Sequence, residues 1–246
     1  MRIVIIIPTY NEKGSIKELL VHICARIVPT IPHYSFFIVV VDGNSPDGTA
    51  DAVEEVITHH KNIFLLKEPE KRGIGAAYAT GIQYALERLR ADAVMEFDGD
   101  GQHNPDDIAK LVREFNNGFD LVIGSRYIEG GSVPKEWALW LKFLSRFGSL
   151  FTRIVLHLPT RDNTSGLKLT RVKGFAEHLP IEDTAILSRD YAYKIQFLYD
   201  IIQRGGRVTE VPIQFRERVL GKSKSTLRDV FDSLRVVLVL RFRKEI

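Results

Sequence analysis

Two acidic residues separated by one glycine follow an apolar stretch near the middle of the chain. The motif Asp98-Gly99-Asp100-Gly101-Gln102-His103 comes directly after Val94–Phe97. Carboxylate and amide oxygens are hard ligands, so Asp98, Asp100 and Gln102 suit Mg²⁺ or Mn²⁺, and such an ion would share its coordination with substrate phosphates. The alternative is a simple tight turn, because Asp-Gly is common in turns.

The elements around this motif predict the edge on which it lies. Five short apolar segments rich in β-branched residues are predicted strands: Ile3–Ile7, Phe36–Val41, Ile63–Lys67, Ala93–Phe97 and Leu121–Ile123. Segments with helical apolar spacing lie between them, which predicts an α/β fold with a mostly parallel sheet and helices on both faces. Ligands bind such sheets at the carboxyl ends of the strands, where Asp98 and Asp100 would lie. Helices are predicted to start at Ser45-Pro46-Asp47 and at Asn104-Pro105.

A second polar motif, Pro8-Thr9-Tyr10-Asn11-Glu12, ends the first predicted strand at the same edge. Tyr10 offers a ring that can stack on a nucleobase, and Glu12 offers an acceptor for a base or ribose donor. Helix capping is the alternative explanation, since Asn and Glu are common at helix starts.

Two further segments are suited to phosphate. Gly73-Ile74-Gly75 lacks the third glycine of a dinucleotide fingerprint, which argues against a Rossmann oxidoreductase. With Arg72 it could still present a cation and backbone amides to a phosphate, or form a plain helix-start loop. Near the carboxyl end, residues 215–224 carry four cations around Gly221. This pattern suits a loop that closes on a diphosphate, and equally a solvated basic turn.

No nucleophilic triad or zinc spacing is visible in the sequence. Cys24 lies among apolar neighbours in a predicted helix, which indicates a core residue rather than a nucleophile. His103 is the one histidine at the candidate site, and capping of the Asn104-Pro105 turn is its alternative role.

Composition excludes several classes of protein. The 246 residues are 45% hydrophobic and 26% charged, which is typical of a globular domain and not of a disordered chain. A net charge of +3 argues against a general nucleic-acid binder. A single cysteine excludes an internal disulfide and fits a reducing compartment. No apolar run reaches the length of about 20 residues that a membrane span needs.

The second half of the chain contains two amphipathic segments. Residues Trp137–Leu158 are apolar, but Lys142, Arg146, Arg153 and His157 recur at helical spacing along one stripe. The last predicted helix combines apolar residues from Leu227 onward with a terminal basic cluster. Such helices either lie in a membrane interface or pack on the sheet with the stripe outward.

Taken together, the motifs resemble a known family. They are Ile6–Glu12, Val41-Asp42, Ser45–Thr49, Asp98–His103, Ile123–Tyr127, Arg161–Gly166 and Arg218–Lys224. Their order is similar to that of family 2 glycosyltransferases with a Rossmann-like GT-A fold, and in particular to dolichol-phosphate (polyprenol-phosphate) mannose synthases. The resemblance implies one catalytic domain over residues 1–246, with a nucleotide-sugar-binding half at 1–127 and an acceptor-binding half at 128–246 that carries interfacial helices.

The resemblance also implies an inverting transfer of mannose from GDP-mannose to a polyprenyl phosphate. The residues that it implies for binding of the nucleotide are Pro8, Tyr10, Glu12, Val41 and Asp42. Those implied for the Mg²⁺ or Mn²⁺ ion and the donor diphosphate are Asp98, Gly99, Asp100 and Gln102. Arg126, Arg218 and Lys224 are implied to contact the sugar, the diphosphate or the acceptor phosphate. With Asp98 and Asp100, these three cations form the expected catalytic set.

One departure concerns the donor base. The family usually has two adjacent acids after the second strand, but here Asp42 is followed by Gly43-Asn44. A UDP-sugar donor with the same lipid acceptor is therefore an alternative, and a non-catalytic nucleotide-sugar-binding subunit is another. The resemblance implies a protein peripheral to the cytoplasmic face of a membrane, with no nucleic-acid partner, and a membrane-anchoring subunit is a further candidate partner.

Overall fold

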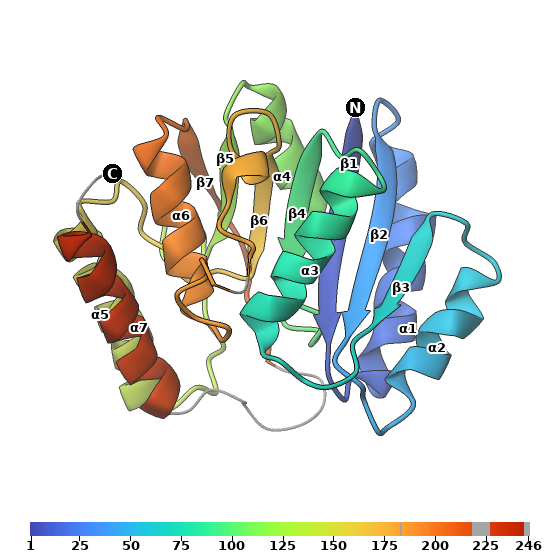
Figure 1. Cartoon of the computed structure of the whole chain (residues 1–246), viewed down its shortest axis with the longest axis horizontal. Helices are drawn as coiled ribbons and strands as arrows, with labels where there is room; N and C mark the ends of the chain where they lie inside the picture. Colours follow the sequence, from blue (N-terminus) through green and yellow to red (C-terminus); the bar gives the residue numbers. More distant parts are fainter. Residues whose placement is uncertain (183, 218–226, 244–246) are drawn as a thin grey trace.

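The computed structural model of the chain describes residues 1–182, 184–217 and 227–243. Within these residues one sheet of seven strands forms the centre of the molecule (Figure 1). The strands are β1 (Arg2–Thr9), β2 (Ser35–Asp42), β3 (Ile63–Lys67), β4 (Ala93–Phe97), β5 (Leu121–Ser125), β6 (Leu167–Arg171) and β7 (Val208–Pro212). The longer helices are α1 (Lys13–His22), α2 (Thr49–Ile57), α3 (Ile74–Glu87), α4 (Asp107–Asn116), α5 (Leu139–Leu156), α6 (Tyr193–Gln203) and α7 (Leu227–Phe242). Short helical turns cover Ile23–Ile27, Val28–Thr30 and Ala176–His178.

The strand order is β3-β2-β1-β4-β6-β5-β7, and only β6 runs antiparallel to its neighbours. Helices cover both faces of the sheet, so the predicted mostly parallel α/β sheet is confirmed. All five predicted strands are present. The antiparallel strand β6 is not among them. Its second residue is Lys168, and sequence alone assigns a lysine to the surface, whereas this side chain is buried.

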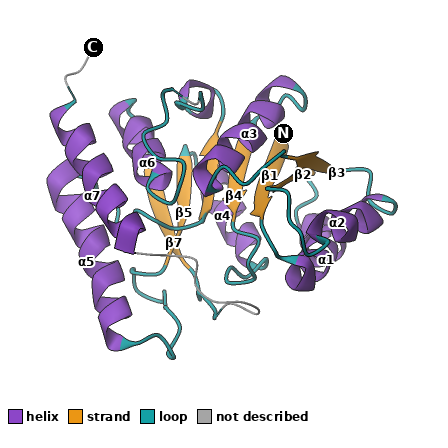
Figure 2. Ribbon diagram, turned by 60° about the horizontal axis from the view of Figure 1, so that its bottom comes forward, coloured by secondary structure: helices purple, strands orange, loops and turns teal. Residues whose placement is uncertain are grey.

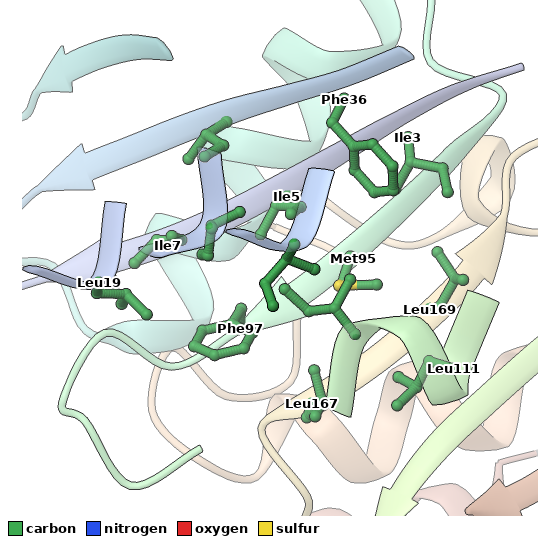
Figure 3. Close-up of a cluster of buried hydrophobic side chains, with 14 of the residues drawn as sticks. Ile3, Ile5, Ile7, Leu19, Phe36, Met95, Phe97, Leu111, Leu167 and Leu169 are labelled. Atoms are coloured by element: carbon green, nitrogen blue, oxygen red, sulfur yellow. The ribbon is translucent and has the colours of Figure 1, made fainter. Parts of the chain in front are cut away.

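Two apolar cores hold the helices against the sheet. In β1, Ile3, Ile5 and Ile7 point to the core shared with α1, α2 and α4 (Figure 3), whereas Val4 and Ile6 point to the core shared with α3, α6 and α7. This alternation is the period of two that a strand imposes on its side chains. Because both faces are covered, the strand is apolar at every interior position.

The two predicted helix starts differ in outcome. The helix after Asn104-Pro105 begins at Asp107, close to the prediction. The prediction at Ser45-Pro46-Asp47 is wrong, because α2 begins at Thr49 after Gly48, whose φ is 84°. There the hydroxyl of Ser45 donates to Asp42 instead of capping a helix, and the carboxylate of Asp47 accepts the N–H of Thr49.

The segment predicted as a helix at Trp137–Leu158 forms α5, which begins two residues later than predicted. α7 contacts both α5 and α6 (Figures 1 and 2). One side of α5 is buried through Thr152 and Leu156, and the other exposes large apolar side chains. In the part of the chain that the structure describes, no helix has both the length and the apolar character needed to cross a membrane.

Candidate active site

The carboxyl ends of the strands at the centre of the sheet open onto a cleft, on the edge that Figure 2 turns forward. β1 pairs directly with β4, so the segments that follow these two strands lie side by side. Six residues predicted from the sequence line this cleft, namely Pro8, Tyr10, Glu12, Asp98, Gly99 and Asp100. Arg72 and Gly73 of the predicted phosphate-binding loop line it as well.

The carboxylate of Asp98 is fixed by two partners. Its Oδ1 accepts a hydrogen bond of 2.8 Å from the Tyr78 hydroxyl, and its Oδ2 lies 2.9 Å from the ammonium of Lys194. Gly166 lies against the carboxylate, since a Cβ there would be 1.8 Å from Oδ2. Burial raises the pKa of Asp98, but the charge of Lys194 and the hydrogen bonds from Lys194 and Tyr78 act against it, and the net effect is a lowered pKa. Asp98 is therefore an ionised group held in one orientation.

Further buried polar side chains lie behind Asp98. Glu96, two residues earlier on β4 and so on the same face, accepts a hydrogen bond of 2.7 Å from the Tyr193 hydroxyl. The Nζ of Lys168 donates to the backbone carbonyl of Lys194 at 3.2 Å. Burial raises the pKa of Tyr193 well above its ordinary value, so its hydroxyl remains a donor. Sequence reasoning misses this network, although the acid at position 96 inside an apolar strand is a signal for it.

Asp100 and Gln102 form the outer part of the motif. The Oδ1 of Asp100 accepts the backbone N–H of Gln102 at 3.1 Å. The amide nitrogen of Gln102 donates to the carbonyl of Arg216 at 3.1 Å, which leaves the amide oxygen as an acceptor. These oxygens are the donor type that Mg²⁺ or Mn²⁺ takes, so the side chains fit such an ion. Among the described residues, no cluster of three His, Cys, Asp or Glu side chains could hold a metal by itself.

His103 is buried between the rings of Phe97 and Phe215. Neither ring nitrogen has a hydrogen-bond partner among the described residues, and neither caps the Asn104-Pro105 turn. Burial lowers its pKa to about 4, so the ring is neutral near pH 7. Its Nε2 is 3.9 Å from Oδ2 of Asp98, which is too far for a hydrogen bond.

Arg126, at the end of β5, is buried in a bidentate pair with Asp162. Its Nε and Nη2 donate to the two carboxylate oxygens at 2.7 Å each, and Nη2 also donates to the Thr164 hydroxyl at 2.9 Å. Burial lowers the pKa of Arg126, but the charge of Asp162 and its hydrogen bonds to Arg126 act together against burial, and the net effect is a raised pKa. The backbone amides of residues 161 and 162 donate to Glu210 on β7, which anchors the loop that carries Asp162.

The remaining predicted residues lie elsewhere. Val41 is fully buried in the apolar core. The carboxylate of Asp42 accepts hydrogen bonds from the Thr9 hydroxyl at 2.9 Å and from the N–H and hydroxyl of Ser45. Within the described part of the chain, Val41, Asp42, Gln102 and Arg126 are not among the cleft-lining residues. Arg218 and Lys224 lie outside the described residues.

We predict that Asp162→Asn destabilises the protein by about 3–5 kcal/mol, because it leaves Arg126 charged and buried without its partner. Urea denaturation measures the change, and Asp51→Asn on the exposed face of α2 is the control, with a change within about 0.5 kcal/mol.

The pH dependence gives a second readout of the same pair. Burial raises the pKa of Asp162, but the charge of Arg126 and the hydrogen bonds to the carboxylate together bring it below the ordinary value of 3.8. The stability that Asp162 contributes is therefore present above 3.8 and lost as the pH falls through the lower folded-state pKa. Wild type should lose stability more steeply than Asp162→Asn below this pH. Parallel profiles would contradict the assignment.

Comparison with known proteins places the chain in a family. A sequence model described as glycosyl transferase family 2 matches residues 4–179. The chain is 36% identical over 224 residues to an undecaprenyl-phosphate mannosyltransferase of Micrococcus luteus, covering 91% of this chain and 87% of that protein. It is 33% identical over 234 residues to a polyprenol monophosphomannose synthase of Mycolicibacterium smegmatis, covering 95% and 84%.

The fold is similar to that of the mannosyltransferase PcManGT from Pyrobaculum calidifontis, solved in complex with GDP-Man and Mn²⁺. The TM-score is 0.65 at 21% identity, over 100% of this chain and 65% of that chain. This likeness concerns the fold, and the sequence matches establish the family. The chain is therefore a glycosyltransferase and belongs to glycosyltransferase family 2.

Proposed function

We propose that this enzyme transfers mannose from GDP-mannose to the phosphate of a polyprenyl phosphate, with inversion at the anomeric carbon. The observation that carries the proposal is the pair Asp98 and Asp100 at the floor of the cleft, in a chain similar to two proteins named as polyprenyl-phosphate mannose transferases. The fold neighbour solved with GDP-Man supports the choice of donor.

The nucleotide would bind along the carboxyl edge of the sheet. Pro8, Tyr10 and Glu12 line the cleft and would contact the nucleoside. Val41 and Asp42 would support the same pocket from the end of β2, since the Asp42 carboxylate fixes the neighbouring strand end through Thr9.

Asp98, Asp100 and Gln102 would hold the Mg²⁺ or Mn²⁺ ion together with the donor diphosphate. Gly99 lies close to β1, where a Cβ would be 3.1 Å from the carbonyl oxygen of Pro8, so its small size keeps the motif against the strand end. A bound divalent ion would neutralise charge on the leaving diphosphate. The fold neighbour solved with Mn²⁺ supports this part of the proposal.

The reaction needs charge neutralisation more than proton transfer. An oxygen of the acceptor phosphate forms the new bond to the anomeric carbon, and the bond from that carbon to the diphosphate breaks on the opposite face. The nucleophile is already an anion, so no strong general base is required. Arg126, Arg218 and Lys224 would contact the sugar or the phosphates and align the two anions for in-line attack.

The acceptor half would meet the membrane through α5. Besides Trp140, its exposed large apolar side chains are spaced by four, four, three and four residues, which places them on one face. These side chains, which we call the α5 apolar face, are Leu139, Phe143, Phe147, Leu150 and Ile154. Arg146 and Arg153 are exposed beside this face, an arrangement that suits an anionic lipid surface. The protein would then work at the cytoplasmic face of a membrane, directly or with an anchoring subunit.

In a donor panel of radiolabelled GDP-mannose, UDP-glucose and UDP-N-acetylglucosamine, we predict that GDP-mannose transfers the most label into a polyprenyl phosphate. The measurement is label recovered in the lipid phase. Preferential transfer from a UDP-sugar would overturn the mannose assignment in favour of the alternative donor. No transfer from any donor would favour a non-catalytic nucleotide-sugar-binding subunit.

Removal of the metal should abolish transfer, because the diphosphate would lose its neutralising charge. We predict that EDTA stops the reaction and that added Mg²⁺ or Mn²⁺ restores it. Asp100→Asn should lower the rate on the order of a thousandfold, which is about 4 kcal/mol in the barrier. Asp51→Asn is the matched control. Full activity of Asp100→Asn, or of wild type in EDTA, would refute the metal site.

Liposome flotation tests the membrane proposal. We predict that the chain floats with anionic vesicles, more weakly at high salt, and that Lys142→Glu with Arg146→Glu reduces binding. Phe143→Asp with Phe147→Asp should abolish it, because the α5 apolar face would carry charge. Val21→Asp, at an exposed apolar position on α1, is the control. If wild type fails to float in every condition, a separate partner must bring the enzyme to its acceptor.

A further inference from the structure

The cleft extends across the ends of several strands, from the acids after β4 to the segment after β3. The cleft is lined at one end by Asp98 and Asp100, and at the other end by Glu68 and Arg72. In the order β3-β2-β1-β4, these ends are three strand spacings apart, about 14 Å. This span is comparable to an extended nucleoside diphosphate. A donor with its diphosphate at Asp100 therefore extends its base toward β3, an orientation that rests on the proposed function.

Glu68 and Arg72 are held side by side at that end. The side chain of Glu68 is only 5% exposed, and its Oε1 accepts hydrogen bonds from Nη2 of Arg72 and, at 3.1 Å, from the hydroxyl of Thr80. The same Arg72 nitrogen donates to the Thr80 hydroxyl at 2.8 Å. An acceptor and a donor are thus fixed next to each other in the wall of the cleft, and both bonds described for the carboxylate use Oε1.

Asp42, the acid that the sequence resemblance implies for nucleotide binding, is not available to contact the base. The carboxylate of Asp42 is already occupied by Thr9 and Ser45, and it is absent from the cleft lining among the described residues. Asn44, the polar residue that follows Asp42 and Gly43, donates its amide N–H to the carbonyl of Pro69. Of these three side chains, the carboxylate of Glu68 is the one that lines the cleft.

The side chains of Glu68 and Arg72 together are complementary to guanine. The Watson–Crick edge of guanine presents two adjacent donors, N1–H and N2–H, beside the acceptor O6. A carboxylate with a neighbouring guanidinium offers the complementary set, and hydrogen bonds to charged groups are the stronger kind. Uracil presents one N–H between two carbonyl oxygens, so one of its oxygens would face the carboxylate. We propose that Glu68, oriented by Arg72 and Thr80, is the residue that selects a guanine nucleotide.

Nucleotide binding to the purified full chain tests this without catalysis. Calorimetric titration with GDP, IDP and UDP in the presence of Mn²⁺ compares wild type with Glu68→Gln. Wild type should bind GDP at least about tenfold more tightly than UDP, and IDP, which lacks the N2 amine, should fall between them. Glu68→Gln should weaken GDP binding by about tenfold or more, leave UDP within about threefold, and remove the difference between GDP and IDP.

The control is Glu70→Gln, which makes the same charge change two residues away at an exposed position outside the cleft lining. It should bind all three nucleotides as wild type does. UDP binding and the melting temperature of Glu68→Gln report whether that variant is folded. If Glu68→Gln keeps the wild-type preference for GDP, or loses GDP and UDP equally, the proposal is overturned while the GDP-mannose donor stands. If wild type itself binds UDP more tightly than GDP, the GDP-mannose donor is refuted, and with it the proposed role of Glu68.

Discussion

The site depends on how the negative charge of Asp98 is balanced at the end of β4. An ionised carboxylate buried without a partner would cost several kcal/mol. Here the ammonium of Lys194 and the hydroxyl of Tyr78 contact its two oxygens, and Gly166 leaves room for it. These two contacts therefore keep the acid ionised and oriented. A charged group can then be held in the lining of the cleft, directly beside the apolar core.

This balance also fixes the elements around the site. Tyr78 belongs to α3 and Lys194 to α6, so both helices must lie on the same face of the sheet, next to each other, for Asp98 to be satisfied. Close packing makes this possible, because a Cβ on Gly81 of α3 would be 2.3 Å from Cγ2 of Ile6. The buried network behind Asp98 joins β6 to the same assembly through Lys168. The charged centre and the apolar core thus stabilise one arrangement.

The molecule presents two surfaces of opposite character. The cleft at the carboxyl edge of the sheet is lined with acids and cations, whereas the α5 apolar face exposes large hydrophobic side chains. Such exposed apolar side chains along one helix face mark an interaction surface rather than ordinary packing. The proposed transfer from a water-soluble nucleotide sugar to a lipid phosphate would use both surfaces. The ion pair between Arg126 and Asp162 joins two segments that precede and follow α5 in the chain.

The sequence by itself determined five of the seven strands, their mostly parallel arrangement and the edge at which the motifs meet, because hydrophobic periodicity and Asp-Gly spacing are local signals. It could not identify the partners of Asp98, since Lys194 is 96 positions away and a lone lysine in a helix predicts a solvated side chain. For the same reason, the acid that we propose to contact the nucleotide base is Glu68 and not Asp42. The carboxylate of Asp42 accepts hydrogen bonds from Thr9 and Ser45, whereas Glu68 lines the cleft. Burial and long-range pairing, which only the tertiary structure fixes, decided those assignments.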